Sequence, residues 1–290
     1  MPAAVERATV RLELPSRPES LTLVRAMLAG LAKPLELEPE LLSDVKTAVS
    51  EACNNVVLHA YPDRPGPLLV TLALTDECVE VVVRDRGCGI EQSAPSEGWM
   101  SVGLALIRTL ARRAEYLDVP GGGTEARMLF ARRSAHELDT EACRTLEPRS
   151  PEVSLSGDAV VTLAPVSLLA APLGRVARAA AAWARFSVDR FSDLHLVTDA
   201  IAAHAQTATG AAEVSFAIAA ADRRLEVTIG PLISGSGARL QVDHAAGAAW
   251  SPLSLLADEV IAEPIEGAEM LRVVLLDPGG PSVSAQQLLG

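Results

Sequence analysis

The chain has 290 residues, of which 49% are hydrophobic and 21% are charged, a composition typical of a folded globular protein rather than a disordered one. Its formal net charge of −12 excludes a general affinity for nucleic-acid backbones or anionic membrane surfaces, because both require concentrated Lys and Arg. No stretch has the composition of a signal peptide or a membrane span, so we expect a cytoplasmic protein with no membrane anchor and no direct contact with nucleic acid.

The cysteines give a weaker indication of the compartment. Cys53, Cys78, Cys88 and Cys143 have no spacing typical of a zinc site or a disulfide scaffold, which favours a reducing environment.

Hydrophobic periodicity predicts the elements of the first half in chain order. We expect a strand at residues 8–14, helices at 19–33 and 38–59, and strands at 68–74 and 78–85. A glycine turn and a loop follow, then an amphipathic helix at 103–114 and a strand at 124–131 that is entered through "PGGG".

The same order of elements returns in the second half. Strands are expected at residues 159–165, 213–219, 224–230 and 267–276, and helices at 173–186, 191–208 and 252–262. "LSDVKTAVSEA" aligns with "FSDLHLVTDAI", "VEVVVRD" with "LEVTIGP", and "GTEARMLF" with "GAEMLRVVL". Duplication explains this pattern, and coincidence between common folds is the alternative. The expected domains are residues 1–132 and 158–277, with a polar linker at 133–157 and a tail at 278–290.

The helix expected at 38–59 carries the first candidate site. Leu42, Val45, Val49, Ala52 and Val56 form its apolar face, whereas Lys46, Ser50 and Asn54 are expected to face water. Glu51, Asn55 and His59 lie on the flank between these faces at intervals of four residues, where they can converge on a ligand. Taken alone, such a flank is also compatible with a solvated helix surface.

Three glycine motifs follow in a fixed order. In "DRGCGI", Asp85 ends a strand, and Gly87 and Gly89 allow the backbone to approach a flat ligand. In "SVGLALI", Gly103 opens a helix at Leu104, where free backbone N–H groups favour an anion such as phosphate. "GGGT" places Thr124 before the last strand. Each motif is common by itself, and their order and spacing make the set informative.

At these residues the first half resembles the GHKL (histidine-kinase-like) ATPase superfamily, and within it the anti-sigma factor and serine-protein kinase group. The resemblance covers about residues 8–131 and rests on "SEACNNVVLHAY", "DRGCGI", "SVGLALI" and "GGGT". It implies an α+β fold, the two-layer α/β sandwich known as the Bergerat ATP-binding fold, which the repeat would place twice in tandem.

The resemblance also implies roles for individual residues. Asn55 would hold Mg²⁺, and Glu51 would be the catalytic residue, acting as a general base or positioning the attacking hydroxyl. Asp85 would accept a hydrogen bond from the adenine amino group of ATP. The remaining cofactor-binding positions would be Gly87, Gly89, Gly103, Leu104 and Thr124. His59 is either part of this site or a packed structural residue.

Two features depart from the family pattern. Ser101 stands where the end of the ATP lid usually has a glycine, and the lid, which includes Gly98, is short. Nucleotide binding is therefore better supported than kinase turnover. Cys53 and Cys88 flank the expected pocket, either as redox-sensitive thiols or as small buried hydrophobes.

The second half lacks these ligands. "VTDAIAAHA" has alanines at or near the position of Asn55, and Pro231 replaces Asp85. We therefore expect residues 158–277 to keep the fold without binding ATP. They would either pack on the first copy, in place of the homodimer that such kinases often form, or make a separate protein-binding surface.

The resemblance implies an ATP- and Mg²⁺-dependent protein that regulates transcription by partner switching. It would bind a sigma factor or a STAS-like anti-sigma antagonist, and phosphorylate a serine or threonine of the antagonist. Arg25 is either a partner contact or a solvent-facing residue. The alternative function is a non-catalytic, nucleotide-gated interaction module. A sensor histidine kinase is disfavoured because no phospho-acceptor hairpin or membrane sensor precedes the domain.

Overall fold

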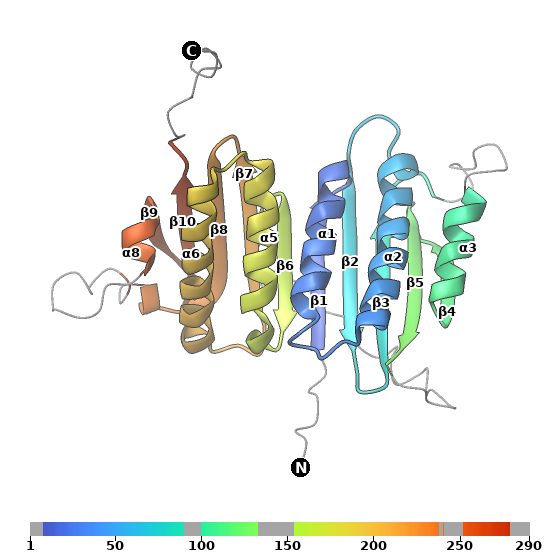
Figure 1. Cartoon of the computed structure of the whole chain (residues 1–290), viewed down its shortest axis with the longest axis horizontal. Coiled ribbons are helices and arrows are strands. Elements are labelled where there is room, and N and C mark those ends of the chain that lie inside the picture. The colour runs from blue at the N-terminus through green and yellow to red at the C-terminus, as the bar shows by residue number, and fades with distance from the viewer. Residues whose placement is uncertain (1–7, 90–99, 133–153, 238–239, 241–251, 279–290) are drawn as a thin grey trace, which may run out of the picture.

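A computed structural model describes residues 8–89, 100–132, 154–237, 240 and 252–278. In these ranges the chain forms a 10-stranded antiparallel sheet, with its helices packed on one face (Figure 1). Mixed α/β architecture is thus confirmed. None of the helices in the described ranges is long and apolar enough to span a bilayer.

The described residues of the first half form eight helices and strands and one short π-helix. They are β1 (Ala8–Pro15), α1 (Pro18–Leu31), α2 (Pro39–Asn55), the π-helix η1 (Val56–Ala60), β2 (Pro67–Leu74), β3 (Cys78–Asp85), α3 (Met100–Leu110), β4 (Arg113–Asp118) and β5 (Thr124–Ala131). Proline occupies the first turn of both α1 and α2, where its missing N–H costs no helical hydrogen bond.

The second half follows the order strand, helix, helix, strand, strand, helix, strand, strand, as the first half does. Its elements are β6 (Ala159–Ala164), the short 3₁₀ turn η2 (Val166–Leu168), α5 (Ala170–Trp183), α6 (Val188–Ala208), β7 (Val214–Ala221), β8 (Arg224–Ile233), α8 (Pro252–Leu256), β9 (Glu259–Ile265) and β10 (Ala268–Leu276).

The two halves meet at the centre of the sheet, where β1 pairs with β6. The strand order is β4-β5-β3-β2-β1-β6-β7-β8-β10-β9, so corresponding strands lie at equal distances on either side of the β1–β6 pair. Above this pair, α1 and α5 lie side by side (Figure 1). A Cβ added to Gly30 of α1 would lie 2.7 Å from the Cα of Pro172 in α5, so glycine permits this close contact.

Alternation along the strands explains why the helices cover one face. Along β1, Ala8, Val10, Leu12 and Leu14 are buried and the residues between them are partly exposed. The buried set faces the helices because strand side chains alternate between the two faces. The apolar stripes of α1, α2, α5 and α6 pack onto this surface and complete a common core.

Two strands were missed by the sequence prediction, which extended the preceding helices into their first residues. The helix expected at 103–114 runs instead from Met100 to Leu110, so Gly103 and Leu104 lie inside it rather than at its start. The N–H of Arg112 then donates to the carbonyl oxygen of Leu129 on β5, which leads the chain into β4. The helix expected at 252–262 ends at Leu256, and the β-branched Val260 and Ile261 belong to β9. Both strands lie at the edges of the sheet.

The cysteine prediction was also incomplete. Cys78 is disulfide-bonded, whereas Cys53 and Cys88 are free. The spacing of cysteines in the sequence does not reveal which of them the fold brings together.

Candidate functional site

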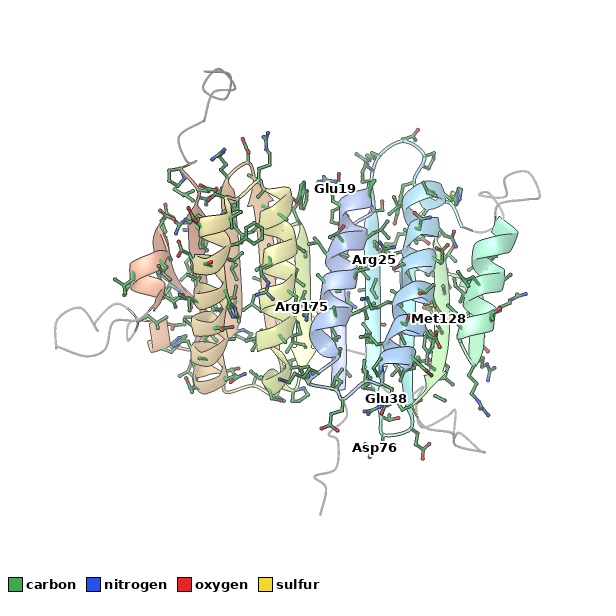
Figure 2. The ribbon with its side chains drawn as sticks, viewed as in Figure 1. Glu19, Arg25, Glu38, Asp76, Met128 and Arg175 are labelled. Atoms are coloured by element: carbon green, nitrogen blue, oxygen red, sulfur yellow. The ribbon has the colours of Figure 1, made fainter. Side chains whose placement is uncertain are left out.

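The expected site begins on α2, whose apolar face is mostly as predicted. Val45, Val49, Ala52 and Val56 are buried, but Leu42 is only partly so. Ser50 was expected to face water and does not. Its hydroxyl accepts a hydrogen bond from Nε of Arg25 at 2.9 Å and donates to the carbonyl oxygen of Lys46 at 2.6 Å. Arg25 of α1 therefore points toward α2 (Figure 2).

The end of α2 departs from the single helix predicted at 38–59. After Asn55 the chain widens into the π-helix Val56–Ala60, which carries His59. Short π-helical segments occur often at functional sites. Here the segment brings His59 and Ala60 to the wall of the same cavity as Asn55.

Asp85 ends β3 and lies beneath this cavity. It is 3% exposed, and its Oδ1 accepts a hydrogen bond from the N–H of Gly87 at 2.7 Å. Burial raises the pKa of the Asp85 carboxyl, and the backbone N–H groups of Gly87 and Thr124 oppose that rise. A buried carboxylate at the floor of a cavity is a specific acceptor for a donor group on a ligand.

Glycines allow the loop after Asp85 to pack closely against the backbone of the π-helix. A Cβ on Gly87 would lie 2.1 Å from the carbonyl oxygen of Ala60, so only glycine fits there. The same carbonyl accepts a hydrogen bond from the N–H of Cys88 at 3.0 Å, which fixes the "DRGCGI" loop against the π-helix. Gly89, with φ of +79°, then lines the cavity.

The start of α3 lies against Glu51 and Asn55. A Cβ on Gly103 would be 3.2 Å from Oε2 of Glu51 and 3.9 Å from Oδ1 of Asn55. Leu104 lines the cavity beside them. The lid residues 90–99, Gly98 among them, lie outside the described residues, and nothing is described of the side chain of Ser101.

The cavity has a volume of about 270 Å³. Five of the predicted residues line it, namely Asn55, Asp85, Gly89, Leu104 and Thr124. Gly87 and Gly103 are not among its lining residues, although Gly87 lies against Ala60 and Gly103 lies near Asn55, which both line it. Glu51 lies instead in a neighbouring groove that is also lined by Arg25, Lys46 and Ser50. The structure thus brings the candidate residues together, with Glu51 beside the cavity rather than in its lining.

Arg108 and Tyr116 also line the cavity, and the sequence analysis missed both. Arg108 lies on α3, one turn beyond Leu104, and helical spacing alone was a signal that could have identified it. Tyr116 lies on β4, the edge strand that was predicted as part of a helix or loop. His59 lines the cavity as well, which favours a role in the site over simple packing.

An ion-pair network on the opposite face of the sheet holds the two strands that carry Asp85 and Thr124. Arg84 of β3 lies opposite Glu125 of β5 and donates to it from Nε at 2.8 Å. Arg127 donates to the other oxygen of Glu125 at 2.8 Å. Burial alone would raise the pKa of the Glu125 carboxyl, but the hydrogen bonds from Arg127 and Arg84 outweigh it and lower this pKa.

The two free thiols differ in environment. Cys53 is fully buried, and burial raises its pKa to about 12 against the opposing charge of Arg25, so it behaves as a small core residue. Cys88 is partly exposed, and its Sγ donates to the carbonyl oxygen of His59 at 3.4 Å.

The geometry fits a purine nucleotide. Val56, Ala60, Val83 and Ala126 supply apolar walls for a flat ring, while Asp85 supplies an acceptor at the base. For a metal ion, the described residues contain no group of three His, Cys, Asp or Glu side chains that could hold it. The amide oxygen of Asn55 instead suits a hard cation whose other ligands are phosphate and water oxygens.

Comparison with known proteins agrees with this geometry. Residues 14–130 match the histidine kinase-like ATPase domain. Over these residues the first half of the chain is similar to that domain. The matched range extends from the end of β1 to the end of β5 and therefore contains every residue of the cavity.

Proteins similar to this part of the chain include an anti-sigma factor and serine-protein kinases. The chain is 29% identical over 129 residues to an anti-sigma F factor of Caldanaerobacter subterraneus subsp. tengcongensis, covering 41% of this chain and 90% of that protein. It is 31% identical over 78 residues to the serine-protein kinase RsbW of Bacillus mycoides, covering 27% of this chain. The chain spans only about half the length of the RsbW relatives it matches, 49% in this case.

A crystal structure of the RsbU and RsbW domains of a Mycobacterium tuberculosis protein also matches. It is 27% identical, with a TM-score of 0.34, and the match covers 44% of this chain and 34% of that one.

Proposed function

We propose that this chain is an ATP- and Mg²⁺-dependent anti-sigma regulatory factor that acts by partner switching in the cytoplasm. It binds a sigma factor or a STAS-like anti-sigma antagonist, and it phosphorylates a serine or threonine of the antagonist. The observation that carries the proposal is the buried carboxylate of Asp85 at the base of a cavity whose rim bears Asn55. Cys78 is disulfide-bonded, whereas a reducing cytoplasm keeps most thiols free, so counting the free thiols of the native protein tests the proposed location.

Each predicted residue would have its own role in binding the nucleotide. Asp85 accepts a hydrogen bond from the adenine amino group, Gly87 and Gly89 let the loop approach the ring, and Thr124 lies beside it. Asn55 contributes an oxygen ligand to Mg²⁺. Gly103 and Leu104 lie near the N-terminal end of α3, which begins at Met100, and the positive end of that helix favours phosphate oxygens beside them. Bound ATP with Mg²⁺ supplies the transferable phosphoryl group and the charge that neutralises it.

The position of Glu51 supports a role in orienting the acceptor. Its carboxylate lies between the wall formed by Gly103 and the groove lined by Arg25 and Lys46. A hydroxyl of a partner protein entering through this groove would meet Glu51 before reaching the cavity. Glu51 would then accept the hydrogen bond of that hydroxyl and hold it for attack on the phosphoryl group.

One observation favours the alternative, a nucleotide-gated interaction module without phosphoryl transfer. Glu51 lines the groove and not the cavity itself. In this alternative, ATP would change partner affinity without phosphoryl transfer, and Glu51 would be one more residue of the partner surface.

Phosphoryl transfer to captured partner proteins separates the two functions. Proteins retained from native lysate with ATP and Mg²⁺ are incubated with radiolabelled ATP and either wild type or Glu51→Gln. The kinase proposal expects labelling by wild type and none by Glu51→Gln, with unchanged ATP affinity in both. Equal labelling by the two proteins would refute the role of Glu51, and no labelling by either would favour the alternative.

We further propose that residues 158–277 are a degenerate copy of the ATP-binding fold, joined to residues 1–132 by a linker at 133–157 and followed by a tail at 278–290. The repeated element order and the symmetric strand order support this. Aligning Ser43 and Asp44 with Ser192 and Asp193 places Ala200 opposite Glu51. It places His204, rather than an alanine, opposite Asn55.

In the second copy, the carboxylate of Glu269 binds the loop that follows β8. Glu269, 6% exposed, accepts hydrogen bonds from the N–H of Gly235 at 2.8 Å, from the Ser236 hydroxyl at 2.6 Å, and from the N–H of Gly237. These bonds lower its pKa despite its burial, with a smaller contribution from His204. The loop after β8 is thereby tied to β10, which supports a copy that takes no nucleotide.

The β1–β6 pairing and the α1–α5 contact support an internal partner in place of a homodimer. In this arrangement one chain presents two Bergerat-like units but a single nucleotide site. A homodimer remains the alternative, and light scattering of the purified chain distinguishes them by mass.

A further inference from the structure

Tyr116 is the one lining residue of the nucleotide cavity whose polar atom is buried and has no hydrogen-bond partner among the described residues. It lies on the edge strand β4, between Glu115 and Leu117, and its ring packs against the core. A hydroxyl left unpaired away from water is costly, so such groups call for an explanation in a ligand or another partner.

The only other tyrosine of the chain has an ordinary structural arrangement. The hydroxyl of Tyr61 accepts a hydrogen bond from the N–H of Arg86 at 2.7 Å and donates to the carbonyl oxygen of Pro67 at 2.7 Å. Tyr61 does not line the cavity. Of the two tyrosine hydroxyls, only that of Tyr61 is satisfied by described protein atoms.

The surroundings of Tyr116 keep its hydroxyl as a donor. Burial raises the pKa of the phenol, and the positive charge of Arg108 opposes this rise only in part. The group is therefore protonated at neutral pH, on a side chain that lines the cavity. It complements Asp85, which is an acceptor at the base of the same cavity.

We propose that Tyr116 is a specificity-determining residue that donates a hydrogen bond to a ring nitrogen of the purine held in this cavity. This inference rests on the nucleotide-binding function proposed above. A purine with an exocyclic amino group carries both a donor and ring-nitrogen acceptors. Asp85 would bind the donor and Tyr116 an acceptor, while the apolar walls would hold the ring faces.

The test compares Tyr116→Phe with wild type in calorimetric titrations of the full chain with ATP and with ADP in the presence of Mg²⁺. Loss of one hydrogen bond should weaken binding by about 3- to 10-fold. Because the contact is to the base, the factor should be the same for both nucleotides. The melting temperature should not fall, since the variant removes only an unpaired hydroxyl. Tyr61→Phe is the matched control. It should leave the affinities for ATP and for ADP, and so their ratio, unchanged.

Two results would overturn this inference while leaving the proposed function intact. The first is equal nucleotide affinity in Tyr116→Phe and wild type. The second is a loss of affinity for ATP but not for ADP, which would indicate a contact to the terminal phosphate. Absence of ATP binding by wild type would instead remove the proposed function, and this inference with it.

Discussion

The backbone of Gly123 lies directly against the carbonyl oxygen of Asp85. A Cβ on Gly123 would be 2.2 Å from that oxygen, and the φ of Gly123 is +100°. The turn before β5 and the end of β3 therefore meet at the base of the nucleotide cavity, where glycine is required both for its conformation and for its lack of a side chain.

Gly123→Ala should therefore damage the cavity far more than Gly121→Ala. Gly121 also has a positive φ, of +94°, but no atom lies within 4 Å of its Cβ position. Gly121→Ala should lower the free energy of unfolding by roughly 1–2 kcal/mol, because alanine is strained at a positive φ. Gly123→Ala adds a backbone clash and should cost about 3 kcal/mol or more. Urea unfolding measures both, and similar losses in the two variants would contradict the close contact.

Asp85→Asn should weaken ATP binding and stabilise the fold at neutral pH. The lost charged acceptor is expected to reduce affinity by about 10- to 150-fold. Because burial raises the pKa of Asp85 above its unfolded value, its stability contribution is full below the ordinary Asp pKa and is lost as pH rises through the raised pKa. The gain of the variant should therefore shrink as pH falls.

Glu125→Gln is the control of opposite sign for this pH dependence. In wild type, the lowered pKa of Glu125 means that its carboxylate stabilises the fold above the ordinary Glu pKa, and this contribution is lost as pH falls. Thermal unfolding from pH 4 to 8 follows both variants. A destabilised Asp85→Asn at pH 7 would show that the carboxylate serves the fold rather than the ligand.

Asn55→Ala should remove the effect of Mg²⁺ on nucleotide affinity. Asn55 lines the cavity, whereas its neighbour Asn54 does not and is the matched control. ATP affinity of Asn55→Ala should fall by roughly tenfold or more in Mg²⁺, since even residues that only support a metal ligand contribute that much. In EDTA, the ATP affinity of Asn55→Ala should equal the ATP affinity of wild type. Retention of a Mg²⁺ effect in Asn55→Ala would move the metal site elsewhere.

The sequence predicted the order of motifs better than the ends of elements. Asp85, Gly89 and Thr124 could be placed because strand ends and glycine turns have strong local signals. Tyr116 could not, because Arg112 and Arg113 continue a helical pattern and only pairing with Leu129 turns the chain into a strand. The bond between Arg25 and Ser50 was equally hidden, since it joins two helices.

The seam between the halves should be sensitive to side-chain volume at Gly30. Its Cβ position lies 2.7 Å from Pro172, so Gly30→Val should force α1 and α5 apart and cost about 1–3 kcal/mol. Ala29→Val, which introduces the same side chain at a half-buried neighbour, is the control and should cost less. Urea unfolding with two probes reports the loss. Equal effects in both variants would argue against close packing of α1 on α5.

Calorimetric titration of the full chain with ATP and Mg²⁺ tests the central claim most directly. A single pocket in the first half predicts one nucleotide bound per chain in wild type, and strongly weakened binding in Asp85→Asn. Two nucleotides per chain, undiminished binding in Asp85→Asn, or no binding at all would contradict it.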